Sequence, residues 1–87
     1  MKSVLMFTMA ACPFCRKAVR YMEGLMEETP RYKDIPLKMI DETLDPDTAD
    51  KYDYYYVPTY YVDEEKVHEG EATKDDIRRV FEAAEEE

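Results

Sequence analysis

Basic residues are scarce in this sequence. It contains 12 Lys and Arg residues against 21 Asp and Glu residues, which gives a formal net charge of −9 at pH 7. A nucleic acid requires a basic surface that neutralises its phosphates, so this charge balance argues against nucleic-acid binding. The same negative charge disfavours contact with anionic membranes. The excess acidity most simply provides solubility, and electrostatic steering towards a basic partner is the alternative.

Long apolar runs are missing as well. No stretch approaches the ~20 apolar residues that a helix needs to span a bilayer. The apolar run after Met1 and Lys2 is too short for a secretory signal, and no small-residue cleavage site follows it. We therefore expect a cytoplasmic protein that does not bind membranes. The 87 residues show no linker and no repeat, so we expect a single domain, residues 1–87. We also expect the protein to be a monomer.

Metal ligands of the soft type are few. The sequence has two cysteines, Cys12 and Cys15, and one histidine, His68. A structural zinc site needs more such ligands than one chain offers here, so we predict no bound metal and no bound cofactor. The cytoplasm keeps thiols reduced, and a pair of nearby cysteines in that compartment is more often catalytic or metal-binding than structural. The cysteine pair is therefore the first candidate for a functional site.

The two cysteines frame the segment Cys12-Pro13-Phe14-Cys15. A nearly continuous apolar stretch, residues 3–9, precedes it and predicts a strand that is covered on both faces. Cys12 suits the N-cap of a following helix and Pro13 its first position, where the missing N–H costs nothing. A thiol at this end of a helix feels the positive end of the dipole, which favours the thiolate. The placement indicates reversible dithiol–disulfide chemistry, and structural packing of the thiols is the alternative. The pKa of Cys12 should be depressed further by two adjacent cations, Arg16 and Lys17.

The remaining sequence predicts alternating strands and helices in the order β-α-β-α-β-β-α. Apolar residues recur at three- and four-residue steps from Phe14 to Met26, which predicts an amphipathic helix that ends near Glu28. Pro58 interrupts the strand-forming stretch 54–62, so it must begin a strand or occupy a special turn. The other expected elements are a strand at 35–40, a short helix from Asp45 and Pro46, a polar turn at 63–66, a strand at 67–69, a last helix capped by Thr73 and Asp76, and a frayed acidic tail at 85–87. This order predicts an α/β fold with a four-stranded mixed sheet flanked by helices, whose first βαβ unit is parallel.

The pattern resembles glutaredoxin-like members of the thioredoxin-fold family. The resemblance covers nearly the whole chain and rests on the cysteine segment between a strand and a helix, on the terminal hairpin and helix, and on the segment Val57-Pro58-Thr59. It implies the thioredoxin fold, with Cys12 as the attacking thiolate and Cys15 as the resolving thiol. Pro58 would be a cis-proline that faces the active site, and the backbone at Val57 would pair with the substrate chain. Pro13 would rigidify the turn and affect the redox potential.

The same resemblance implies glutathione contacts, where the sequence departs from the family. Met9 stands where glutaredoxins usually carry a lysine that binds a glutathione carboxylate, and Ala11 stands where they often carry a tyrosine. Thr73 and Lys74 lie where the γ-glutamyl end of glutathione would be held. The electron source would be either glutathione, acting as co-substrate, or a flavoprotein disulfide reductase, and the sequence does not decide between them.

The resemblance thus implies a thiol–disulfide oxidoreductase that reduces protein or mixed disulfides and serves cell redox homeostasis. Its partners would be disulfide-containing proteins. Two alternatives stay open: a thioredoxin-like electron donor to a specific enzyme such as ribonucleotide reductase, and a dimeric iron–sulfur cluster carrier. Within the family, a proline in the motif disfavours the cluster carrier.

A cluster of tyrosines surrounds Pro58: Tyr52, Tyr54, Tyr55, Tyr56, Tyr60 and Tyr61. In the simplest interpretation, alternate tyrosines pack in the core and the others lie half exposed on the sheet. Alternatively, the three tyrosines just before Pro58 line a groove that receives the substrate peptide.

Overall fold

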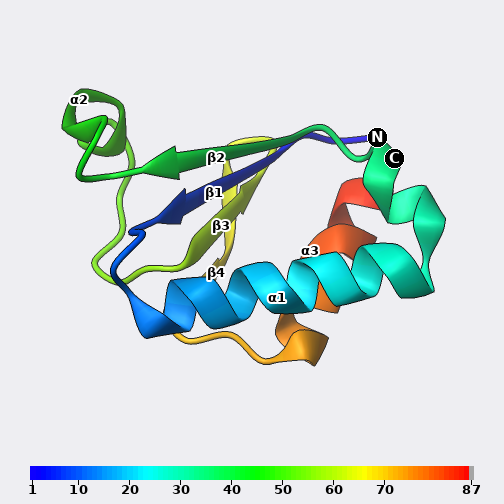
Figure 1. Cartoon of the computed structure of the whole chain (residues 1–87). Coiled ribbons are helices and arrows are strands. Elements are labelled where there is room, and N and C mark those ends of the chain that lie inside the picture. The colour runs from blue at the N-terminus through cyan, green and yellow to red at the C-terminus, as the bar shows by residue number, and fades with distance from the viewer. Residues whose placement is uncertain (87) are drawn as a thin grey trace.

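A mixed four-stranded sheet in the order β2-β1-β3-β4 forms the centre of the fold (Figure 1). The computed structural model describes residues 1–86. Its elements are β1 (Val4–Thr8), α1 (Pro13–Glu28), the 3-10 helix η1 (Pro30–Asp34), β2 (Leu37–Asp41), α2 (Pro46–Ala49), β3 (Thr59–Val62), β4 (Glu65–Glu69) and α3 (Lys74–Glu85). β1 pairs in parallel with β2 and antiparallel with β3, and β3 pairs antiparallel with β4. The predicted fold class is confirmed.

Strand β1 lies in the interior of the sheet and is covered on both faces, which explains its apolar sequence. Val4 and Met6 belong to the main core, which α1 and α3 complete on one face of the sheet. Phe7 points to the other face, where a smaller core forms with Ile40 and Tyr61 beneath α2 and the segment that follows it. Figure 1 shows α1 and α3 together on one side of the sheet and α2 beyond the end of β2.

Helix α1 begins as its sequence predicts, with Cys12 as N-cap in an extended conformation and Pro13 at the first position. Its buried residues follow the expected helical spacing: Cys15, Ala18, Met22 and Leu25. The expectation that Phe14 starts this apolar stripe is wrong. Phe14 is 48% exposed, because the helix turns Cys15 rather than Phe14 towards the sheet.

Two strands begin two residues away from their predicted starts, and the other predicted bounds of β1 and β2 differ by one residue. β2 begins at Leu37 rather than residue 35, because the Ile35 N–H closes η1 by bonding the Tyr32 carbonyl and Pro36 has no N–H. β4 begins at Glu65 rather than residue 67. The turn needs only Asp63 and Glu64, whose φ angles of 47° and 71° give the left-handed conformation of a two-residue hairpin loop.

Side-chain caps fix the last two helices as the sequence predicts. Asp45 accepts a hydrogen bond from the Thr48 N–H at the start of α2, although this helix has only four residues. Thr73 and Asp76 form a reciprocal capping box at the start of α3. The tail was expected to fray from residue 85, but Glu85 still belongs to α3. Glu87 lies outside the described residues.

Within residues 1–86, no helix combines the length and the apolar character that crossing a membrane requires.

Candidate active site

The strand register brings the two predicted halves of the site to one end of the sheet. β1 runs towards the cysteine segment, and its Phe7 lies opposite Thr59, the first residue of the antiparallel β3. This register places Thr8 beside Pro58. Thr8 in turn lines a small hollow together with Cys15, which lies in the first turn of α1. The segment 57–59 therefore lies next to the cysteine pair although more than 40 residues separate them in sequence.

Cys12 is the more accessible of the two thiols, both of which are free. Its N–H donates to the Met9 carbonyl, and its own carbonyl accepts from Cys15 and Arg16, each at 3.1 Å. Partial burial by itself raises the pKa of the Cys12 thiol. Hydrogen bonds from the backbone and side chain of Cys15 and from the Phe14 N–H, together with the Arg16 charge, outweigh this effect. The pKa of Cys12 therefore lies below its ordinary value, which favours the reactive thiolate.

Cys15 lies one helical turn deeper and is 1% exposed. Burial raises its pKa, and the neighbouring Cys12 acts in the same direction. Hydrogen bonds from Thr8 and the Met9 backbone offset this effect only in part. The two thiols thus have opposite environments: Cys12 is accessible and easily ionised, whereas Cys15 is buried and holds its proton.

Arg16 and Asp41 hold the loop between β1 and α1. The Arg16 Nη1 donates to the Ala10 carbonyl, and the Ala10 N–H donates to Asp41 Oδ2, both at 3.1 Å. The other oxygen of Asp41 accepts from the hydroxyl and the N–H of Thr43, and these bonds hold the pKa of Asp41 below its usual range. Asp41 was not among the site residues predicted from the sequence. The sequence feature that could have identified it is its position as an acidic residue at the end of β2. Because β2 is parallel to β1, the ends of both strands meet at the same edge of the sheet.

The positions expected to contact glutathione are dispersed. Met9 lines a hollow of about 200 Å³ beside Cys15 and Arg16, whereas Ala11 is exposed on the loop. The Thr73 hydroxyl is occupied in the capping box of α3. Lys74 pairs with Glu28, the last residue of α1, so the structure does not bring it to the cysteines at the first turn of that helix.

The segment Val57-Pro58-Thr59 passes beneath the surface at the cysteine end of the sheet. The peptide bond between Val57 and Pro58 is cis, as the resemblance implies. Pro58 and Thr59 are fully buried. The Pro58 carbonyl accepts a hydrogen bond of 2.8 Å from Gly70, which joins this segment to the end of β4.

The tyrosines divide into packed and exposed sets, but not by simple alternation. Tyr60 and Tyr61 are adjacent and both buried, because the sheet is covered on both faces. Tyr52 and Tyr54 pack against Phe7, with ring centroids 4.9 and 4.7 Å away. The remaining two rings are exposed on the surface: Tyr55 by 85% and Tyr56 by 70%.

Residues 3–82 match the family model of the thioredoxin domain. The chain belongs to the thioredoxin-domain family. This thioredoxin domain therefore carries its two cysteines where the fold brings together β1, α1 and the start of β3. The predicted thioredoxin-fold family is confirmed, and the glutaredoxin-like features stay predictions. A search of curated proteins returns no match.

Solved structures support the same fold. A malarial protein superimposes with a TM-score of 0.74 at 18% identity over 99% of both chains. A mutant thioredoxin from Halobacterium salinarum gives 0.71 at 26% identity, over 99% of this chain and 76% of the other. Thioredoxin from Fasciola hepatica gives 0.72 at 21% identity, over 97% and 81%.

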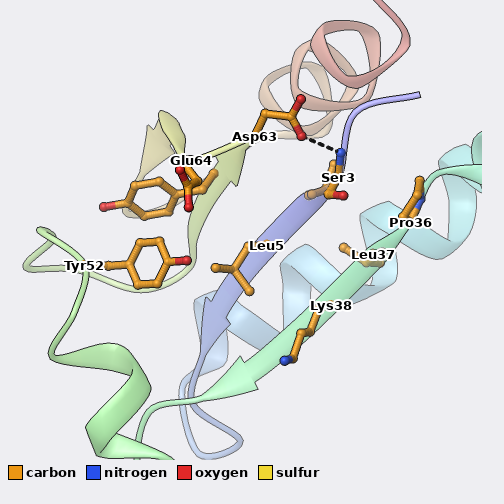
Figure 2. A pocket seen from close by; sticks show the side chains of 10 residues that line it. Ser3, Leu5, Pro36, Leu37, Lys38, Tyr52, Asp63 and Glu64 are labelled. Carbon is orange, nitrogen blue, oxygen red and sulfur yellow. Dashed lines mark hydrogen bonds between the residues drawn. The ribbon is translucent and has the colours of Figure 1, made fainter.

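A hollow of about 470 Å³ lies elsewhere on this thioredoxin domain (Figure 2). Leu5 and Tyr52 line its floor, and Lys38, Asp63 and Glu64 stand around it. It opens where β1 and β2 begin, whereas the cysteines follow the end of β1, so it is separate from the candidate site. Among residues 1–86, no three side chains of His, Cys, Asp or Glu group together as metal ligands.

We expect that Arg16→Gln raises the pKa of Cys12, because the substitution removes a positive charge that stabilises the thiolate. At a pH below that pKa, the rate of Cys12 alkylation by iodoacetamide should fall about twofold, as expected for an exposed charge. Lys17→Gln is a matched control, because the Lys17 ammonium lies over the Tyr21 ring, 5.8 Å from its centroid. If Cys12 alkylation slowed equally in both variants, the pKa of Cys12 would depend on the overall charge of the protein and not on the position of Arg16.

Proposed function

We propose that this protein is a thiol–disulfide oxidoreductase that reduces disulfide bonds through Cys12 and Cys15. The observation that carries the proposal is the opposite environment of the two thiols at the start of α1. Cys12 has a lowered pKa and is accessible, whereas Cys15 is 1% exposed and has a raised pKa. Membership of the thioredoxin-domain family supports the same chemistry.

The proposed reaction has two exchange steps. The Cys12 thiolate attacks one sulfur of the substrate disulfide, which forms a mixed disulfide and expels the other sulfur as a thiolate that takes a proton from water. Cys15 then attacks the Cys12 sulfur as a thiolate and expels the second substrate sulfur, which takes up the proton that Cys15 releases and leaves as a thiol. Two electrons pass from the protein dithiol to the substrate, and the protein is left with a Cys12–Cys15 disulfide.

The proposed substrates are disulfide-containing proteins. Three aromatic rings, Phe14, Tyr55 and Tyr56, are exposed at the cysteine end of the sheet. We call them the aromatic surface. Exposed aromatic rings beside a reactive group are typical of sites that dock another protein. The backbone at Val57 would pair with the extended substrate segment.

The proposed electron source is a flavoprotein disulfide reductase, as for a thioredoxin. Met9 offers no positive charge for a glutathione carboxylate, and the ammonium of Lys74 is engaged by Glu28. A cytoplasmic location would keep the dithiol supplied with electrons.

The test compares two electron sources on one disulfide substrate, insulin. Insulin reduction is measured with thioredoxin reductase and NADPH, and separately with glutathione, glutathione reductase and NADPH. We expect turnover with thioredoxin reductase only. Turnover with glutathione would instead make the protein a glutaredoxin-type enzyme. If pre-reduced protein fails to transfer electrons to insulin at all, the proposed function is wrong.

A further inference from the structure

The segment that presents Tyr55 and Tyr56 is held through its backbone by one carboxylate. Glu69 Oε2, at the end of β4, accepts hydrogen bonds from the N–H groups of Tyr55 and Tyr56 at 2.6 and 3.0 Å. The other oxygen of Glu69 accepts from the Lys66 ammonium at 2.7 Å. Both oxygens of this side chain are therefore used.

Other side chains of the β3–β4 hairpin hold the carbonyls of the same segment. The Asp53 carbonyl accepts from the Tyr61 hydroxyl at 2.7 Å and from the Lys66 ammonium at 3.1 Å. The Thr59 hydroxyl donates to the Tyr56 carbonyl. The backbone of residues 53–56 is thus anchored by the hairpin, and the exposed Tyr55 and Tyr56 rings are left free for another molecule.

A β-bulge makes this arrangement possible. Residues three apart on a regular strand point to opposite faces of a sheet. In β4, however, Lys66 lies opposite Tyr61 and His68 lies opposite Tyr60, so Val67 is the extra residue of the bulge. The bulge shifts the alternation by one residue and brings Lys66 and Glu69 to the same face. That is the face of Tyr61 and the segment 53–56.

Glu69 remains ionised across the neutral range. The Lys66 ammonium and the Tyr55 and Tyr56 N–H groups lower the pKa of Glu69 to about 2. Its side chain is 20% exposed, so solvent competes only in part for these bonds. The carboxylate therefore keeps Oε2 as a charged acceptor for the segment, and Oε1 as an acceptor for Lys66, at every pH at which the thiol of Cys12 ionises.

We propose that Glu69 is a positioning residue for protein substrates: its carboxylate fixes the Tyr55–Tyr56 backbone so that both rings form a docking surface beside the cysteine pair. This surface would bind an extended substrate segment that carries an apolar side chain near its disulfide. The two rings provide apolar contact area, whereas the backbone N–H groups of Tyr55 and Tyr56 are already bonded to Glu69. This inference rests on the proposed disulfide reduction.

The activity test uses Glu69→Ala with Glu65→Ala as the matched control. Glu65 is an exposed carboxylate on the same strand, so the two substitutions remove the same charge. Pre-reduced protein is mixed in single turnover with insulin or with hydroxyethyl disulfide, and Cys12 alkylation is measured alongside. In Glu69→Ala the rate constant for insulin reduction should fall about fivefold, roughly the effect of losing one net hydrogen bond. The rates of hydroxyethyl disulfide reduction and of Cys12 alkylation should not change. Glu69→Gln, which keeps one acceptor oxygen, should restore part of the insulin rate.

Amide hydrogen exchange tests the positioning itself, without reference to activity. The Tyr55 and Tyr56 amides should exchange about tenfold faster in Glu69→Ala than in the wild type or in Glu65→Ala. Unchanged exchange, or equal loss of rate for insulin and the small disulfide, would overturn the positioning role alone. If the wild type reduces neither disulfide, the proposed function is overturned and this inference with it.

Discussion

Cys12→Ser is expected to abolish disulfide reduction, with a loss of at least about a thousandfold in the insulin rate constant. A serine hydroxyl does not ionise near neutral pH, so it cannot replace the thiolate that the helix start, Cys15 and Arg16 stabilise at position 12. The buried Cys15 should not substitute for it, because it is 1% exposed and its pKa is raised. Pre-reduced protein and a stopped-flow measurement provide the rate.

Cys15→Ser provides the matched comparison. The first exchange step should remain, because Cys12 keeps its accessibility, but the resolving step should be lost. A stable mixed disulfide between Cys12 and the substrate should therefore accumulate, and intact-mass spectrometry detects it. Accumulation of the adduct in Cys12→Ser instead would reverse the assigned roles of the two thiols.

Phe7→Ala is expected to lower the free energy of unfolding by about 3–5 kcal/mol. The Phe7 ring is fully buried and lies at the centre of the smaller core, in contact with the rings of Tyr52, Tyr54 and Tyr61. The four-residue α2 and the segment after it cover this core, and so short a cover can do little to close the cavity. Urea unfolding monitored by far-UV circular dichroism measures the change.

The same substitution at the exposed Phe14 is the control. Phe14→Ala should change the free energy of unfolding by less than about 0.5 kcal/mol, since its ring is 48% exposed. Because Phe14 belongs to the aromatic surface, this variant should instead lower the insulin rate. A small loss of stability in Phe7→Ala, similar to that of Phe14→Ala, would mean that the smaller core contributes little to the fold.

Features that depend on neighbouring residues were predictable from the sequence. The start of α1 follows from Cys12 and Pro13, and the start of α3 follows from the capping box of Thr73 and Asp76. Local hydrogen bonds and the fixed φ of proline decide such boundaries, so no knowledge of the tertiary structure is needed. The order of strands and helices followed from the same local signals.

Features that depend on strand register were not predictable. The contact between Asp41 and Ala10 requires that β1 and β2 be parallel and aligned residue by residue. The role of Glu69 depends on the bulge at Val67, and no local feature of the sequence predicted that bulge. Lys74 was expected near the cysteines, yet it pairs with Glu28, because the packing of α3 against α1 decides its position.

The bulge in β4 also affects how the protein behaves at high concentration. β4 is an edge strand of the sheet, and an unprotected edge can pair with the edge of another molecule and begin aggregation. The extra residue Val67 breaks the regular spacing of free backbone groups, and three charged side chains surround it on the strand: Glu65, Lys66 and Glu69. The irregularity that directs Glu69 towards the tyrosine segment therefore also makes this edge a poor template for adding another strand.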